Sequence, residues 1–290
     1  TSVGRNPHMA KVKKRGLKVS GVWGRHVFKR LKAYTSVKPQ IGKQELILIT
    51  TKAYDTEGAI KQVLPLVGDE TLVVSAQNGI GNEETIAKFV GQERTLGCMA
   101  IFGAILTEPG SVKVTVYASE CLVGSLSGNE ETPKRIARTF SEAGIPTLPT
   151  DDIIREKWMK AFYNMALNPL STILKVPYGT LGKFEETKTV MRKILEEAFM
   201  VAERKGVNLK FDCNGYFEFL LKRQLPPTAK HESSMLQDII KGKRTEIEFL
   251  NGAIVGLGET LGVETPVNET ISNIVKAMEH LARAKRPETH

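Results

Sequence analysis

Long apolar runs, paired cysteines and early acidic residues are all missing from this chain of 290 residues. No apolar run reaches the roughly 18 residues that a membrane-spanning helix needs, and no charged-then-apolar signal pattern opens the chain. The three cysteines, Cys98, Cys121 and Cys213, lie far apart and outside the CxxC or Cys/His spacings of metal sites. We therefore expect a cytoplasmic protein with reduced, packed thiols, no bound metal and no membrane partner.

The acidic residues that are missing all belong to one part of the chain. Residues 1–44 hold twelve lysines and arginines and no aspartate or glutamate, although the net charge of the whole chain is only +9. Such a segment suits a phosphate group, whether of a nucleotide cofactor or of nucleic acid, or it forms a solvated surface. Aromatic residues are sparse among these cations and no nucleic-acid-binding motif is present. We therefore expect no nucleic-acid partner.

The chain is long enough for two hydrophobic cores, and its pattern changes near residue 150. Before this point short β-rich runs alternate with helical stretches, which is typical of a mainly parallel sheet covered on both faces. Strands are expected at 45–51, 71–76, 94–102, 112–117, 121–126 and 145–148, the fourth and fifth as an antiparallel pair. Helices are expected at 56–66, from residue 82 and at 133–143.

After residue 150 the strand signal disappears. Helices are expected at 153–174, 188–205, 216–223, 234–259 and 268–286. We therefore predict an α/β domain at residues 1–149 and an all-α domain at residues 150–290.

This domain order suggests a dinucleotide-dependent enzyme, yet the Gly-x-Gly-x-x-Gly turn expected after the first strand is missing. If residues 1–3 end the second strand of such a fold, the missing part is the first strand, its glycine turn and its helix. The glycines of residues 256–262 follow no strand, and we interpret them as a helix end. Arg5 would then stand where an acidic residue binds the 2′-hydroxyl of NAD. A guanidinium there favours the 2′-phosphate of NADP(H).

Two further polar residues follow predicted strands. Lys52 comes after the strand at 45–51, and Asn78 comes after the strand at 71–76. Open α/β sheets bind ligands at the carboxyl ends of their strands. Lys52 and Asn78 are therefore candidate ligand contacts, the alternative being that each only solvates a loop.

Three polar side chains, Lys160, Asn164 and Asn168, recur every four residues in an otherwise apolar stretch. At 3.6 residues per turn they share one face of a helix, and the residues around them predict burial of its other sides. Because a buried polar stripe must have partners, we interpret it as the wall of an active site. The alternative is the solvated face of an ordinary amphipathic helix. Pro169 offers no N–H to the Met165 carbonyl and predicts a kink or a helix end at Asn168.

Several segments carry a specific resemblance by their content and order. They are Thr51-Lys-Ala-Tyr54, Gln77-Asn-Gly-Ile-Gly81, Lys160 through Leu170, Ser233-Ser-Met-Leu-Gln-Asp238, Thr245-Glu-Ile-Glu248 and Asn251-Gly252. Over almost its whole length the chain resembles the ketopantoate reductases, also called 2-dehydropantoate 2-reductases. The resemblance implies a Rossmann-like dinucleotide-binding domain and a helical domain of the 6-phosphogluconate-dehydrogenase-like type. It also implies NADPH-dependent reduction of 2-dehydropantoate to pantoate, in pantothenate and coenzyme A biosynthesis.

Carried over residue by residue, the resemblance implies a role for each candidate. Lys160 would be the general acid. The hydroxyl and carboxylate groups of the substrate would be held by Asn164, Asn168 and Ser234, with Asn78 as a further contact. The cofactor would be contacted by Lys52, Asn78, Glu246 and, through its backbone, Ala104. Glu246 would also lie near the reacting oxygen as a second catalytic residue.

Two positions depart from the family's pattern. Tyr178 and His231 stand where the family has asparagines, which puts those two contacts in doubt. Ser234 also fits a helix N-cap, and it would face the same cleft as Glu246 if the helix predicted at 234–259 is continuous.

Hydride transfer to a 2-keto acid builds negative charge on the ketone oxygen, and a lysine ammonium can both stabilise and protonate that oxygen. Two alternatives stay open. One is a related two-domain NADP-dependent dehydrogenase acting on another keto acid, since fold alone does not fix function. The other is a non-catalytic nucleotide-binding relative. The sequence also leaves the oligomeric state open, a homodimer included.

Overall fold

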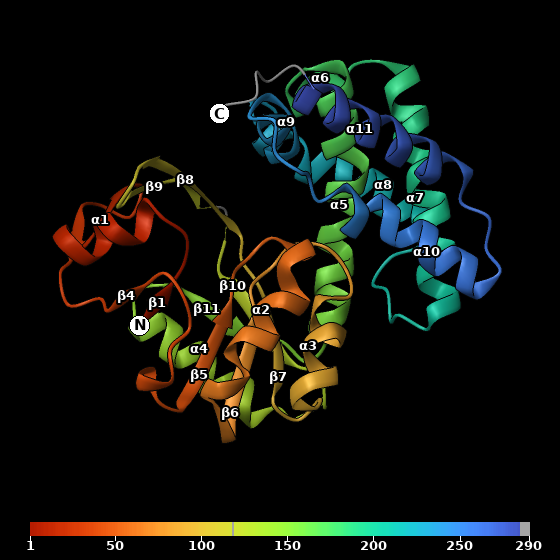
Figure 1. The fold of residues 1–290 in the computed structure, drawn as a ribbon. Helices are drawn as coiled ribbons and strands as arrows, with labels where there is room; N and C mark the ends of the chain where they lie inside the picture. The colour runs from red at the N-terminus through yellow and green to blue at the C-terminus, as the bar shows by residue number, and fades with distance from the viewer. Residues whose placement is uncertain (118, 285–290) are drawn as a thin grey trace. The chain divides into compact units, whose positions relative to one another are not determined.

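The computed structural model describes residues 1–117 and 119–284, and its contacts divide the chain into two compact units (Figure 1). The α/β unit holds residues 1–51, 55–77 and 83–153. The helical unit holds the chain from Ile154 onward and two short segments from earlier in the sequence, Lys52–Tyr54 and Asn78–Asn82. Among the described residues, no helix is long and apolar enough to cross a membrane. None of the three cysteines forms a disulfide, and Cys98 and Cys121 are buried, as predicted for packed thiols.

The central sheet of the α/β unit has five strands in the order β11-β10-β7-β6-β5. Their bounds are β5 Gln44–Ile49, β6 Val67–Ser75, β7 Thr95–Met99, β10 Cys121–Ser125 and β11 Thr147–Pro149. Strands β5, β6 and β7 run parallel, β10 is antiparallel to β7, and β11 is parallel to β10. The alternation of strands and helices before residue 150 therefore gives a largely parallel sheet.

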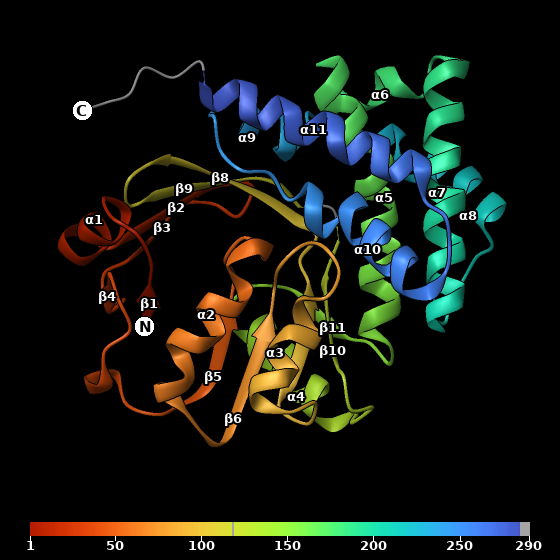
Figure 2. The same ribbon diagram turned by 45° about the vertical axis from the view of Figure 1, so that its right-hand side comes forward.

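Helices cover both faces of this sheet, as its apolar strands require. Helices α2 (Thr56–Val63) and α3 (Asn82–Val90) pack on one face (Figure 2). There Val73 of β6 lies in one buried cluster with Ile60 and Ile86. Helix α4 (Glu131–Glu142) packs on the other face, where Val74 meets Ile136. The carboxyl ends of β5 and β6 thus lead directly into the segments that carry Lys52 and Asn78.

Two smaller sheets complete the α/β unit. Strand β1 (Ser2–Val3) pairs in parallel with β4 (Ala33–Tyr34), and helix α1 (His8–Arg15) lies between them in sequence. The second sheet has the order β3-β2-β9-β8. Its strands are β2 Leu17–Gly21, β3 His26–Phe28, β8 Phe102–Glu108 and β9 Ser111–Tyr117.

The antiparallel pairing predicted between 112–117 and 121–126 is wrong. Strand β9 pairs with β8 and β2, whereas β10 pairs with β7 and β11. The reason is a tight turn at Pro109-Gly110, where Gly110 has φ 85° and Glu108 lies opposite Ser111. Proline followed by a glycine of positive φ favours such a turn, which folds β9 back onto the strand before it.

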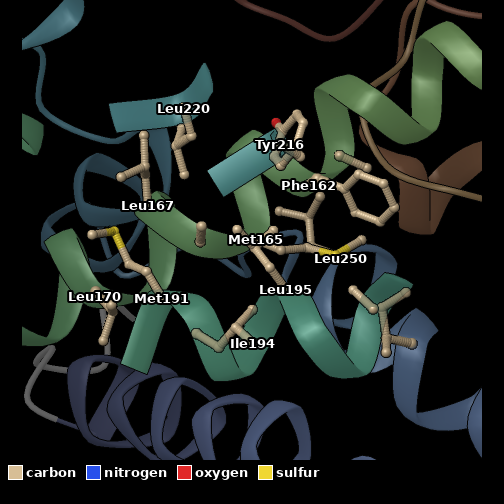
Figure 3. Close-up of a cluster of buried hydrophobic side chains, with 14 of the residues drawn as sticks. Phe162, Met165, Leu167, Leu170, Met191, Ile194, Leu195, Tyr216, Leu220 and Leu250 are labelled. Carbon is tan, nitrogen blue, oxygen red and sulfur yellow. The ribbon is translucent and has the colours of Figure 1, made fainter. Parts of the chain in front are cut away.

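The helical unit is built around α5 (Ile153–Leu174). The other helices are α6 Tyr178–Leu181, α7 Glu185–Lys205, α8 Cys213–Phe219, α9 Ser234–Ile240, α10 Asn251–Leu261 and α11 Pro266–Ala284. A π-helical turn at Leu220–Gln224 follows α8, and 3₁₀ turns lie at Pro226–Thr228 and Ile247–Phe249. Figure 3 shows the buried cluster in which side chains of α5, such as Phe162 and Met165, meet those of α7 and α8.

The single helix predicted at 234–259 is wrong. Helix α9 ends at Ile240, and α10 begins only at Asn251. Gly242 interrupts the helix with φ 56°, a left-handed conformation that glycine adopts without strain. The predicted helix end at 256–262 is confirmed, because α10 stops at Gly262 in the left-handed conformation.

Pro169 does not end α5, so of the predicted kink or helix end the helix end is wrong. The helix continues to Leu174 with Pro169 inside it. The carbonyl oxygen of Met165, which proline leaves without its helical donor, accepts a hydrogen bond from Asn251 Nδ2 at 3.3 Å. A side chain from α10 thus replaces the missing backbone donor, and the helix passes through the proline with this carbonyl satisfied.

Candidate active site

The polar stripe on α5 lies along a helix that is otherwise buried. Trp158, Phe162 and Met165 are at most 1% exposed, as the sequence predicted for these faces. Lys160 and Asn164 are half-buried, and Asn168 is 6% exposed. The stripe therefore becomes more enclosed toward Asn168, so a ligand that reached Lys160 would meet carboxamides farther along the helix.

Asn168 is fixed by hydroxyl groups from two directions. The Tyr178 hydroxyl donates to Asn168 Oδ1, and Thr172 Oγ1 donates to the Asn168 carbonyl oxygen at 2.7 Å. The Thr172 hydroxyl also bonds to that of Ser233 at 2.9 Å, and Ser233 Oγ accepts from the Leu236 N–H at 3.0 Å. This chain of bonds ties the end of α5 to the start of α9.

Ser234 is the first residue of α9 and is exposed. Its predicted role as helix N-cap is wrong, because the cap is Ser233, whose side chain accepts from Leu236 N–H. Ser233 is fully buried, so Ser234 is the serine of the pair that is open to a ligand. The break in the helix after Ile240 also removes the continuous helix through which Ser234 and Glu246 were expected to share one face.

Lys52 lies in a cluster with two carboxylates. Its ammonium is 2.8 Å from Asp238 Oδ2 and 3.2 Å from Glu246 Oε2, and the Ala53 N–H donates to Glu246 Oε1 at 3.1 Å. Burial alone would lower the pKa of Lys52, but the charges of Glu246 and Asp238 outweigh it and raise the pKa above its ordinary value. Lys52 is therefore a cation throughout the working range of an enzyme. The structure brings Lys52 and Glu246 together.

Other contacts hold the two short segments of the helical unit in place. The Arg244 guanidinium stacks over the Tyr54 ring, 4.8 Å from its centroid. The Ile80 N–H donates to the Phe249 carbonyl at 3.0 Å. Asn78 is exposed, and its carbonyl accepts from the Asn82 side chain at 2.8 Å, which leaves the Asn78 carboxamide open to a ligand.

The remaining two candidates belong to the α/β unit. Arg5 follows β1 closely, and its side chain is 88% exposed and forms an ion pair of 3.0 Å with Asp55. Ala104 is exposed in β8, opposite Val114 of β9. Arg5 thus presents a guanidinium on the surface, where a phosphate could replace the weak exposed pair with Asp55.

Two family models match the chain. Residues 1–128 match the family described as "Ketopantoate reductase PanE/ApbA", and residues 152–279 match its C-terminal part. The chain belongs to the ketopantoate reductase family. Membership confirms the resemblance, the Rossmann-like and helical fold class, and the oxidoreductase class predicted from the sequence.

Named ketopantoate reductases align with most of the chain. The 2-dehydropantoate 2-reductase of Aquifex aeolicus (strain VF5) is 42% identical over 266 residues, which cover 91% of this chain and 85% of the relative. The enzyme of the same name from Pyrococcus horikoshii (strain ATCC 700860 / DSM 12428 / JCM 9974 / NBRC 100139 / OT-3) is 36% identical over 281 residues, covering 97% and 90%.

Solved structures of related enzymes have the same fold. A ketopantoate reductase from Ralstonia eutropha JMP134 has a TM-score of 0.85 at 28% identity, covering 96% of this chain and 90% of its own. A D-mandelate dehydrogenase in ternary complex with NADH and anilino(oxo)acetate has a TM-score of 0.88 at 30% identity, covering 97% and 90%.

Sequence reasoning gave no role to two acidic residues of this ketopantoate reductase family member. Asp238 binds Lys52, and Glu279 of α11 accepts from the Thr245 N–H at 2.7 Å, directly before Glu246. Glu279 could have been found from spacing, because it continues the buried stripe of Ile271 and Val275 at intervals of four. A carboxylate on such a stripe needs a buried partner. The Asp238 contact spans 186 residues and leaves no local signal.

Proposed function

We propose that this protein reduces 2-dehydropantoate to pantoate with NADPH. The observation that carries the proposal is the stripe of Lys160, Asn164 and Asn168 on a buried helix, in a chain whose family relatives are named for this reaction. An ammonium followed by two neutral carboxamides suits a small keto acid. It offers one acid to the reacting oxygen and donors for the other oxygens without a second acid beside them.

In this mechanism Lys160 is the general acid. NADPH, when bound, supplies the hydride that reduces the ketone carbon. The Lys160 ammonium stabilises the negative charge that develops on the ketone oxygen and transfers a proton to it, which completes the hydroxyl group of the product. Asn164, Asn168 and Ser234 hold the hydroxyl and carboxylate groups of the substrate, so that the ketone meets Lys160 in one orientation.

The clustered charges around Lys52 have a separate role in the proposal. Lys52, Asn78 and Glu246 contact the cofactor, with Ala104 contributing its backbone. Asp238 and Glu246 both bind Lys52, and this fixes the ammonium in one position. A fixed cation keeps its orientation when the ligand arrives, which lowers the cost of ordering on binding.

NADPH rather than NADH is proposed because of Arg5. Its exposed guanidinium lies just after β1, in a segment with no acidic residue before Glu45. Guanidinium and phosphate form strong, paired, charge-assisted hydrogen bonds. The 2′-phosphate would therefore replace Asp55 as the partner of Arg5.

A second candidate is the reduction of a different 2-keto acid with the same machinery. Two observations favour it: the structural similarity to a D-mandelate dehydrogenase bound to NADH, and the aromatic residues Tyr178 and His231 in place of asparagines. Aromatic rings near Asn168 would suit a keto acid with a larger apolar part.

The cytoplasmic location and a homodimer likewise stay predictions.

The test is the oxidation of NADPH, followed at 340 nm, with 2-dehydropantoate and with phenylglyoxylate as the aromatic 2-keto acid. We expect turnover with 2-dehydropantoate at a kcat/KM at least tenfold higher than with phenylglyoxylate. The reverse order would favour the second candidate. Cofactor binding without turnover of either acid would favour a non-catalytic relative.

A further inference from the structure

The Asn168 carboxamide is held by its oxygen alone. The Tyr178 hydroxyl donates to Oδ1, and among the described residues no group accepts a hydrogen bond from Nδ2. Burial raises the pKa of Tyr178, so its hydroxyl stays protonated and acts as a donor. Because this hydroxyl donates to the amide oxygen, it fixes the orientation of the carboxamide. The two N–H groups of Nδ2 then point away from Tyr178.

Tyr178 is itself held firmly. It is 3% exposed, its N–H donates to the His231 carbonyl at 3.0 Å, and its ring lies edge-on to those of Tyr163 and His231 at 5.9 Å and 5.2 Å between centroids. The Tyr163 hydroxyl bonds instead to Thr228 at 2.7 Å. The two tyrosines therefore share one aromatic cluster, but only Tyr178 reaches the polar stripe of α5.

We propose that Tyr178 is a positioning residue that turns the N–H groups of Asn168 toward the carboxylate of the keto acid. The inference rests on the proposed function for the identity of the substrate. Without the tyrosine hydroxyl, the carboxamide could rotate and present its oxygen to the carboxylate, which repels it. Tyr178 thereby selects for a substrate that brings an acceptor to this point.

The first test compares Tyr178→Phe with Tyr163→Phe, which removes a hydroxyl from the same aromatic cluster without touching Asn168. We expect Tyr178→Phe to raise KM for 2-dehydropantoate about tenfold, as for the loss of one hydrogen bond, and to change KM for NADPH less than twofold. Tyr163→Phe should leave both values near those of the parent. In the Asn168→Ala background, Tyr178→Phe should have no further effect on KM. Equal effects of the two tyrosine variants, or additive effects with Asn168→Ala, would overturn the proposal.

A second variant, Asn168→Asp, keeps the acceptor for Tyr178 but replaces the N–H donors by a carboxylate oxygen. We expect KM for the keto acid to rise at least as much as in Tyr178→Phe, with an unchanged melting temperature. A KM equal to that of the parent would show that the donors do not face the substrate.

An NMR measurement separates this inference from the proposed function. In protein labelled with ¹⁵N-asparagine, the side-chain amide pair of Asn168 is assigned by its loss in Asn168→Ala. We expect this pair to be sharp in the parent and to shift and broaden in Tyr178→Phe but not in Tyr163→Phe. If the parent reduces no keto acid, the proposed function fails, while this spectrum still decides whether Tyr178 orients Asn168. An unshifted pair in Tyr178→Phe would overturn the positioning role.

Discussion

Lys160 is the residue on which the proposed chemistry depends most. We expect Lys160→Ala to lower kcat by about 10²-fold or more, the range for losing a general acid. The measurement is the steady-state rate of NADPH oxidation at saturating keto acid. Lys193→Ala, which changes an exposed lysine on α7, is the control and should retain full activity. A Lys160→Ala enzyme within threefold of the parent would remove Lys160 from the mechanism.

Arg5 decides the predicted choice of cofactor. Arg5→Ala should weaken the binding of NADPH about tenfold and hardly change the binding of NADH. Only NADPH carries the 2′-phosphate with which Arg5 would form a charged hydrogen bond. Asp55→Asn should strengthen the binding of NADPH, since it frees the Arg5 guanidinium from its ion pair. Fluorescence titration of both cofactors measures these changes. Equal losses for NADPH and NADH in Arg5→Ala would mean that Arg5 does not bind the 2′-phosphate.

At the scale of single elements, we expect the hydrogen bond between α10 and α5 to matter for the stability of the protein. Asn251 is fully buried, and its Nδ2 donates both to the Met165 carbonyl and to Asn268 Oδ1 at 3.0 Å. Asn251→Ala would leave the buried Met165 carbonyl unsatisfied, so we expect a loss of about 1–3 kcal/mol in the free energy of unfolding. Urea denaturation measures this loss. Asn273→Ala, on the exposed side of α11, should change stability by less than about 0.5 kcal/mol. Similar values for both variants would contradict the role of Asn251.

Element boundaries followed from sequence where a local signal marked them. The helix at 153–174 was predicted with its full length, and Gly262 marked the end of α10. The errors arose where the deciding contact was distant or the break subtle. Asn251 lies far along the sequence from Pro169, so periodicity could not show which group would satisfy the Met165 carbonyl. The single residue Gly242 divides a stretch whose apolar pattern otherwise favours one helix.

At the scale of the whole molecule, the change from α/β to all-helical structure was visible in the sequence, because strand and helix periodicities differ. The grouping of Lys52–Tyr54 and Asn78–Asn82 with the helical unit was not visible. It depends on single contacts, such as Lys52 with Glu246 across 194 residues, that neither composition nor spacing encodes. The polar stripe of α5 was found because all its members lie on one helix. The cluster around Lys52 draws on separate segments, so only the resemblance indicated Glu246, and no signal in the sequence paired it with Lys52.

The proline inside α5 also has a consequence for the order of folding. The backbone hydrogen bonds of a helix normally join residues close in sequence. Here the donor to the Met165 carbonyl lies 86 residues later in the chain. During synthesis, the end of α5 therefore leaves the ribosome well before the residue that completes it. This stretch of a nominally local element has the high contact order of a long-range pairing, so it should mature late, together with α10.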